Sequence, residues 1–209
     1  MKKGISKNTR RAGNTPPTAG RPRDEEATEA ILKAALELGE ELGFEGITVE
    51  GVAARAGVGK STIYRRWANA WAIVAEAFFA DAMRLAPIEQ RGTVRQSFLA
   101  SMLLVARSFR GRHGKILRPL IGRAQTDAGL RRALGEHWLQ PRREVAREMI
   151  RKGMASGELR AGLDPDVVLD ALYGAFYHRL LLPYEGEEVR LSEGYVEKLV
   201  ETVFGGLEG

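Results

Sequence analysis

The sequence of 209 residues contains no cysteine, which excludes disulfides, thiolate-bound zinc and a cysteine nucleophile. Its three histidines, His113, His137 and His178, lie far apart and have neither the spacing of a helical zinc site nor a nearby catalytic partner. Packing or surface positions are the simpler interpretation of all three. We therefore expect no metal site and no cofactor.

Long apolar runs and export signals are also missing. The first 23 residues are rich in Lys, Arg, Gly, Pro, Asn and Thr and lack the apolar stretch that a signal peptide needs. Charged residues interrupt even the apolar segment around residues 71–83, whereas a membrane span needs roughly 18 consecutive apolar residues. These absences predict a soluble, cytoplasmic protein with no membrane partner.

Acidic residues are absent from residues 1–23, which carry seven basic groups. A segment of this charge without hydrophobic anchors does not fold by itself, but it can displace counterions from a polyanion such as DNA. A solubilising tail is the alternative interpretation. Elsewhere, the acidic residues of 161–209 can neutralise the basic excess of 107–160. The basic arm is thus a first indication of a nucleic-acid partner.

Helical periodicity is what the sequence does contain. Apolar residues recur every three or four positions, as in Ile31, Ala35, Leu38 and Leu42 and in a longer stripe over residues 94–109. No alternating apolar and polar runs joined by a hairpin turn occur, so the predicted fold class is all-α. Glycines and prolines, Pro141 among them, divide the chain into predicted helices at 24–42, 48–56, 59–67, 69–85, 94–109, 115–125, 130–140, 142–156, 166–182 and 192–204.

The stretch from Thr48 to Trp67 meets the steric demands of a helix-turn-helix motif. Ala53 allows the two helices to approach closely, and Gly57 can adopt the positive φ that the turn needs. Val52, Val58 and Ile63 are expected to form the shared core. The second helix is then expected to expose basic side chains, hydroxyl groups and one aromatic ring. These belong to Lys60, Ser61, Thr62, Tyr64, Arg65 and Arg66.

These exposed groups suit a DNA groove. Lysine and arginine donate to guanine edges or phosphates, serine and threonine donate to phosphates, and a tyrosine ring can contact a thymine methyl group. An ordinary solvated helix face is the alternative interpretation.

A phosphate-binding loop is the rival interpretation of the same stretch, because residues 54–61 match its loose pattern of a small residue, four spacers and Gly-Lys-Ser. A true loop of this kind follows a buried strand in a parallel sheet. The preceding segment has helical periodicity, so we expect no nucleotide hydrolysis and no enzyme.

The region from Gly20 to Phe79 resembles the TetR family of transcriptional regulators. The similarity lies in Gly20-Arg-Pro-Arg23, Gly43-Phe-Glu-Gly-Ile-Thr-Val49, Val52-Ala-Ala-Arg-Ala-Gly57 and Ser61-Thr-Ile-Tyr-Arg-Arg-Trp67. The resemblance implies a basic arm (1–23), a three-helix DNA-binding head (24–68) and a helical regulatory and dimerisation body (69–209) that begins with a connecting helix (69–86). The function it implies is a homodimeric repressor that binds a roughly palindromic operator in double-stranded DNA and is released by a small-molecule effector.

The resemblance also implies roles for single residues. Thr48 would hold a phosphate, and residues 60–62 and 64–66 would face DNA. Arg21 and Arg23 would enter the minor groove, which an extended Gly-Arg-Pro segment also permits physically. Many family members have a phosphate-contacting lysine where this chain has Ala70, so Asn69 would supply a weaker contact.

The body resembles the family with less specificity. The resemblance places the last two long helices at a dimer interface, where small residues would permit close approach, although packing within one chain explains them almost as well. A ligand pocket would lie among large apolar and aromatic residues, each of which could also be plain core. An adaptor that binds protein rather than DNA is a further alternative. The interface residues are Ala171, Gly174, Ala175 and His178; the pocket residues are Met102, Ile121, Trp138, Tyr173, Phe176 and Tyr177.

Overall fold

A computed structural model of the protein describes residues 21–85, 88–182 and 191–207, and these contain helices and no β-strand. None of the described helices is long and apolar enough to cross a membrane. The predicted all-α class is therefore confirmed. The helices are α1 (Arg21–Leu42), η1 (Phe44–Gly46), α2 (Val49–Ala56), α3 (Lys60–Tyr64), α4 (Ala70–Leu85), α5 (Val94–Arg110), α6 (Arg112–Ala124), α7 (Ala128–Leu134), η2 (Gly135–Leu139), α8 (Gln140–Ser156), α9 (Pro165–Leu181) and α10 (Glu193–Phe204).

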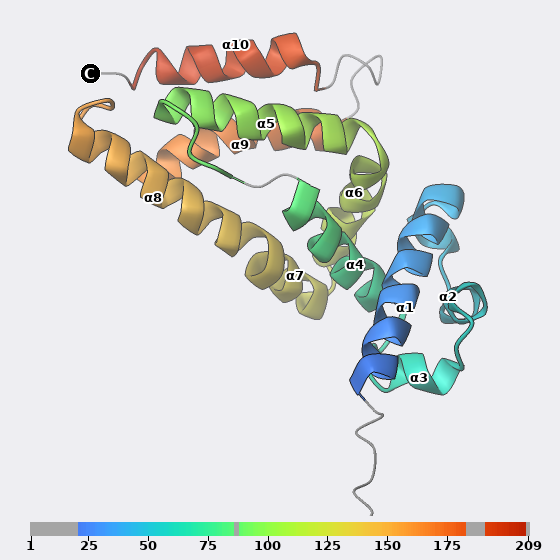
Figure 1. The fold of residues 1–209 in the computed structure, drawn as a ribbon. Helices are drawn as coiled ribbons and strands as arrows, with labels where there is room; N and C mark the ends of the chain where they lie inside the picture. Colours follow the sequence, from blue (N-terminus) through green and yellow to red (C-terminus); the bar gives the residue numbers. More distant parts are fainter. Residues whose placement is uncertain (1–20, 86–87, 183–190, 208–209) are drawn as a thin grey trace, which may run out of the picture.

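Helices α1 to α3 form one end of the molecule, which we call the head, and α5 to α10 form the larger body (Figure 1). Helix α4 packs along α1 and also contacts α6 and α7, so it joins the two parts. Within the body, α5 packs against α6 and α10, and α9 lies between α8 and α10. A displacement of α4 would therefore change contacts in both the head and the body.

Most of the predicted core is buried, including the whole stripe of Val94, Phe98, Met102, Val105 and Phe109. Leu42 was expected on the inner face of its helix, and this prediction is wrong because the side chain is 58% exposed. It is the last residue of α1, and the next residue, Gly43, has φ +71°, which turns the chain away from the core.

Pro141 does not separate two helices as the sequence suggested. Helices α7 and α8 are joined through η2, a π-helical turn in which the amide of Gln140 donates to the carbonyl of Gly135. A proline lacks an N–H and its ring crowds the carbonyl four residues earlier, so a widened turn immediately before Pro141 lets the helix continue. This turn also carries Trp138, which is 2% exposed.

A buried polar cluster ties α4 to α6. The His113 ring nitrogens lie 2.9 Å from Asp81 and 2.8 Å from the Ser108 hydroxyl, and Arg112 pairs with Asp81 at 2.9 Å. Desolvation by burial lowers the pKa of His113 from its ordinary value of 6.5, and Asp81 opposes this shift. The fold thus favours the neutral imidazole over the imidazolium.

Because the folded protein disfavours the imidazolium and the unfolded chain does not, the free energy of unfolding is expected to fall as pH drops below about 6.5. One such group contributes at most about 1.4 kcal/mol per pH unit. Urea unfolding between pH 8 and pH 5, compared for the natural protein and His113→Gln, isolates this contribution. Equal slopes for the two proteins would contradict the assignment.

Candidate functional site

Helices α2 and α3 meet at Gly57, whose φ of 68° and ψ of 29° place it in the left-handed region. The amide of Val58 donates to the carbonyl of Ala53 at 3.1 Å and closes the turn. Val52 and Ile63 are fully buried, and Ala53 is buried where the helices approach. The predicted helix-turn-helix geometry is present.

Two side chains cap the helices that flank α3. The Thr48 hydroxyl accepts from the amide of Gly51 at 3.0 Å at the start of α2, and the Asn69 carboxamide oxygen accepts from the amide of Ala72 at 3.0 Å at the start of α4. Both caps were predicted. The Thr48 oxygen uses an acceptor site here, so its hydroxyl proton can still be donated to a phosphate.

The helix after the turn is shorter than the predicted span of 59–67. Helix α3 has five residues, and Arg65 and Arg66 lie in the turn that follows it. Lys60, Ser61 and Tyr64 are exposed, as are both arginines, whereas Thr62 is half-buried. Of the six side chains predicted to face DNA, five are thus exposed on one short segment.

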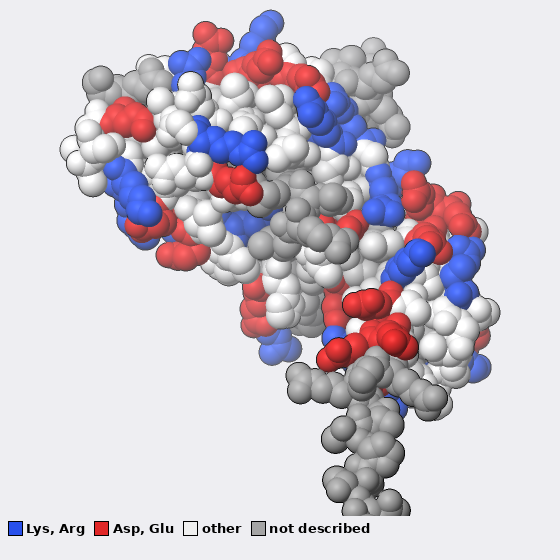
Figure 2. All heavy atoms as spheres, in the orientation of Figure 1, with Lys and Arg blue, Asp and Glu red and all other residues white. Residues whose placement is uncertain are grey.

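Acidic partners meet the cations of this segment, and sequence reasoning missed them. Lys60 lies 3.2 Å from Glu50 of α2, and Arg65 lies 2.6 Å from Asp24 of α1. Over the head, acidic side chains adjoin basic ones (Figure 2). A hydrogen bond to backbone and one from Lys60 lower the pKa of Glu50. Pairs as exposed as these are weak, so another anion can replace the carboxylates at small cost.

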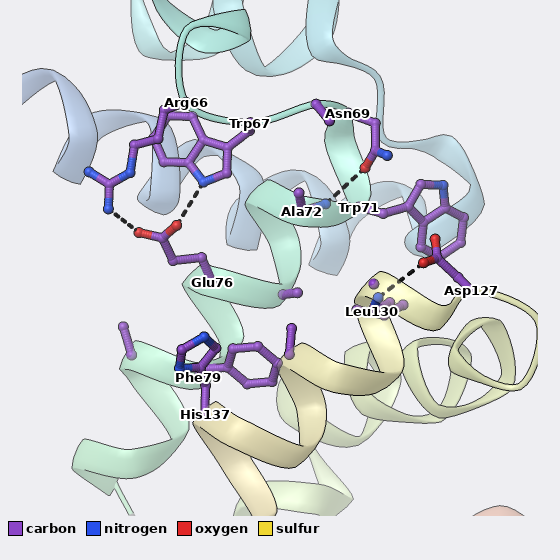
Figure 3. Close-up of a pocket in the computed structure, with 15 residues that line it drawn as sticks. Arg66, Trp67, Asn69, Trp71, Ala72, Glu76, Phe79, Asp127, Leu130 and His137 are labelled. Carbon is purple, nitrogen blue, oxygen red and sulfur yellow. Dashed lines mark hydrogen bonds and ion pairs between the residues drawn. The ribbon is translucent and has the colours of Figure 1, made fainter.

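Arg66 connects α3 to α4. Its guanidinium pairs with Glu76, lies 4.9 Å from the centre of the Trp67 ring and donates to the Thr28 hydroxyl at 3.3 Å. The other carboxylate oxygen of Glu76 accepts from the Trp67 indole at 2.8 Å (Figure 3). Arg66, Trp67 and Glu76 line a cleft of about 820 Å³ that lies between α4 and α7. A side chain of α4, the helix that joins head and body, thus fixes the end of this exposed segment.

Arg21 and Arg23 were expected in an extended segment before the first helix. This prediction is wrong, because the backbone of both residues is helical. Helix α1 begins at Arg21, three residues earlier than predicted. Pro22 suits the first turn of a helix because its fixed φ fits there and its missing amide would have no partner. The arginine side chains and the arm at 1–20 lie outside the described residues.

The phosphate-loop alternative is also wrong. Residues 49–56 form helix α2, so the Gly-Lys-Ser sequence follows a helix rather than a buried strand, and the described residues contain no sheet. Among them no group of histidine and acidic residues could hold a metal ion.

The body contains two adjacent cavities of about 200 and 260 Å³. Trp138, Tyr173, Phe176 and Tyr177 line the first, and Ile121, Trp138 and Tyr177 line the second. Burial raises the pKa of both tyrosine hydroxyls, so both remain protonated donors. The sixth predicted residue, Met102, is fully buried and lines neither cavity. A search for apolar and aromatic spacing could not find the charged lining residue Arg142.

Three of the four small or polar residues predicted on one stripe of α9 are exposed: Ala171, Gly174 and His178. Ala175 is half-buried, and its carbonyl accepts from the Tyr195 hydroxyl of α10 at 3.3 Å. It therefore lies toward α10 rather than on the outer face. The same outer face carries exposed apolar residues that the sequence reasoning missed: Val167, Leu181 and Leu182.

Comparison with known proteins identifies the family. Residues 31–77 match the domain described as "Bacterial regulatory proteins, tetR family", and residues 88–203 match "Tetracyclin repressor-like, C-terminal domain". The uncharacterized HTH-type transcriptional regulator YdeS of Bacillus subtilis is 38% identical over 90% of this chain and 93% of its own length. A DNA-binding transcriptional repressor TetR of Mycobacteroides abscessus is 26% identical over 87% of this chain and 93% of its own length.

The fold agrees with these sequence matches. The crystal structure of the TetR family transcription regulator SCO0332 superposes with a TM-score of 0.73 and 34% identity, covering 87% of this chain and 98% of that one. These relatives are transcriptional regulators and not enzymes. The chain belongs to the TetR family of helix-turn-helix transcriptional regulators.

Proposed function

We propose that the protein is a homodimeric repressor whose two α3 helices enter successive major grooves of a two-fold symmetric operator. Lys60, Ser61, Tyr64 and the segment that follows would contact DNA, with Thr62 at the edge of the contact. Thr48 and Asn69 would hold phosphates on either side, and Arg21 and Arg23 would reach the minor groove. We divide the chain into an arm (1–23), a DNA-binding domain (24–68) and a regulatory domain (69–209).

The observation that carries this proposal is the outward face of α3. Ile63 and Trp67 anchor the segment in the core, while Lys60, Ser61 and Tyr64 remain exposed to solvent. Tyr64, a large ring, is 54% exposed and contributes little to the core. Repression is proposed because the name of the Mycobacteroides abscessus relative states it for that protein.

Selection of bound sequences from random DNA with the purified protein tests the proposal. We expect an enriched inverted repeat with half-sites about 10 base pairs apart or somewhat more, protected as one footprint. Weak binding without sequence preference would contradict the proposal and favour a protein-binding adaptor.

Dimerisation is assigned to the outer face of α9. Val167, Ala171, Gly174 and His178 are exposed at spacings of three and four residues, as in a helix packing seam. A Cβ added at Gly174 would meet no atom within 4 Å, and because Gly174 also lines the first cavity, the proposed seam adjoins that cavity. A second copy of α9 can approach closely there.

Ala171→Arg is expected to weaken the dimer at least about tenfold, because two bulky like charges would meet near the two-fold axis. Sedimentation over a range of protein concentrations measures the change. Val145→Arg on α8 is the control, since Val145 is also an exposed apolar residue, at 48%, and lines a groove with Ile88 and Gln90 in which no residue of α9 takes part. Equal dimerisation of the two variants would reject the α9 interface.

Release by an effector is proposed because a residue that lines both cavities also contacts α4. Trp138 lines both cavities, and its ring centre lies 5.3 Å from that of Phe78 on α4. Two residues earlier on α4, Glu76 binds Arg66. A ligand that moves Trp138 would therefore shift α4 and change the position of the recognition helix.

A further inference from the structure

The two body cavities differ in chemistry. The first contains Arg142, Arg143, Tyr173 and Tyr177 among its lining residues, whereas the second is lined chiefly by leucine, isoleucine and alanine side chains. They share Trp138, Leu139 and Tyr177 as a common wall. A ligand that occupies both cavities would therefore meet polar groups at one end and apolar groups at the other.

Basic residues outnumber acidic ones in the lining of the two cavities. Arg142 and Arg143 line the first cavity and Arg131 the second, against a single carboxylate, Asp170. Arg143 is held by Asp166 at 2.6 Å and by Asp170 at 2.7 Å, so both of its partners come from α9. Arg142 lies over the Trp138 ring at 4.8 Å, which places its charge at the common wall. Because Arg143 is paired with two carboxylates, the lining favours an anion through Arg142 and Arg131.

Two buried hydroxyl groups stand beside this charge. The oxygen of Tyr173 is buried and meets no described partner in good hydrogen-bond geometry, and the same holds for Ser101, which is 2% exposed. Ser101 and Arg142 are the polar neighbours of the Tyr173 phenol. A buried hydroxyl without a well-placed partner is costly, and a ligand oxygen would remove that cost.

We propose that the two cavities together bind an amphipathic anion, with its carboxylate beside Arg142 and Tyr173 and its apolar part against Ile121, Leu134 and the other apolar residues of the second cavity. The combined space falls within the range of small-molecule sites, about 300–1,000 Å³. The inference rests on the proposed effector site and adds the chemical class of the ligand.

Calorimetry with the full chain in the absence of DNA tests the class. Decanoate has an apolar chain of nine carbons and 1-decanol and decyltrimethylammonium one of ten, so the three differ chiefly in charge. Decanoate is expected to bind at least about tenfold more tightly than either of the others. Equal or tighter binding of the alcohol or the cation would overturn the inference.

Variants locate the charged end. Arg142→Gln is expected to weaken decanoate about tenfold and to leave 1-decanol unchanged, and Tyr173→Phe, which keeps the ring, is expected to weaken decanoate severalfold. Arg132→Gln is the control, because Arg132 is exposed on α7 and lines neither cavity. Should Arg142→Gln fail to fold, Tyr173→Phe decides. Decanoate binding that is the same in these variants and in the control would overturn the assignment.

Operator release is measured separately. Decanoate that binds with these dependences but leaves the operator complex intact would support the ligand class and contradict release by an effector. A protein that binds its operator but prefers no anion would overturn the ligand class alone.

Discussion

Replacing Lys60 and Tyr64 together by alanine is expected to weaken binding to the selected operator about a hundredfold or more. Each lost contact to a base or phosphate costs about 1–3 kcal/mol, and about 1.4 kcal/mol corresponds to a factor of ten. The Lys60 side chain is 57% exposed and Tyr64 is 54% exposed, so the free energy of unfolding should change by no more than about 0.5 kcal/mol for each. Fluorescence anisotropy at one fixed salt concentration measures the affinity.

Two further variants separate contact from charge. Lys152→Ala removes the same charge from an exposed position on α8 and should leave the operator affinity nearly unchanged. Glu50→Gln removes the carboxylate that pairs with Lys60 and should leave operator binding equal or tighter. If the double variant bound as well as the natural protein, α3 would not be the element that reads DNA.

The parts of the site that could be predicted from sequence depend on neighbours close in the chain. Thr48 caps a helix through an amide three residues away, and Asn69 does the same. The turn at Gly57 follows from one residue that tolerates a positive φ. Such local rules gave the helix-turn-helix and most helix boundaries.

Features that depend on distant residues could not be predicted. Arg65 pairs with Asp24, which lies 41 residues earlier. Helical periodicity indicates that both are exposed, but not that the helices bring them together. The same limit applies to Arg66 and Glu76. Met102 is an example in the body. Core residues and pocket residues recur at the same helical spacing, and only the packing of the folded chain distinguishes them.

The helix boundary predicted at Pro141 is wrong for a different reason. A proline in a helical pattern normally marks a boundary, and the sequence rule is correct on average. The π-helical turn at Gly135–Leu139 accommodates the ring by widening the helix before it. Its position beside the cavities agrees with the tendency of such turns to occur at functional sites.

Ile63→Ala is expected to lower the free energy of unfolding of the head by about 2–5 kcal/mol, because Ile63 is fully buried in the core with Val52 and Trp67. A helix of five residues is not stable in isolation, so this side chain holds α3 in position.

Ile63→Val is the matched control, with an expected loss of about 0.5–1.5 kcal/mol and operator binding retained. Hydrogen exchange of the amides in α2 and α3 measures the stability of the head even where it opens before the body. An Ile63→Ala protein whose exchange matched that of Ile63→Val would show that packing against α2 does not position the recognition helix. The expected difference instead makes the position of α3 depend strongly on Ile63, which with Trp67 anchors the exposed segment in the core.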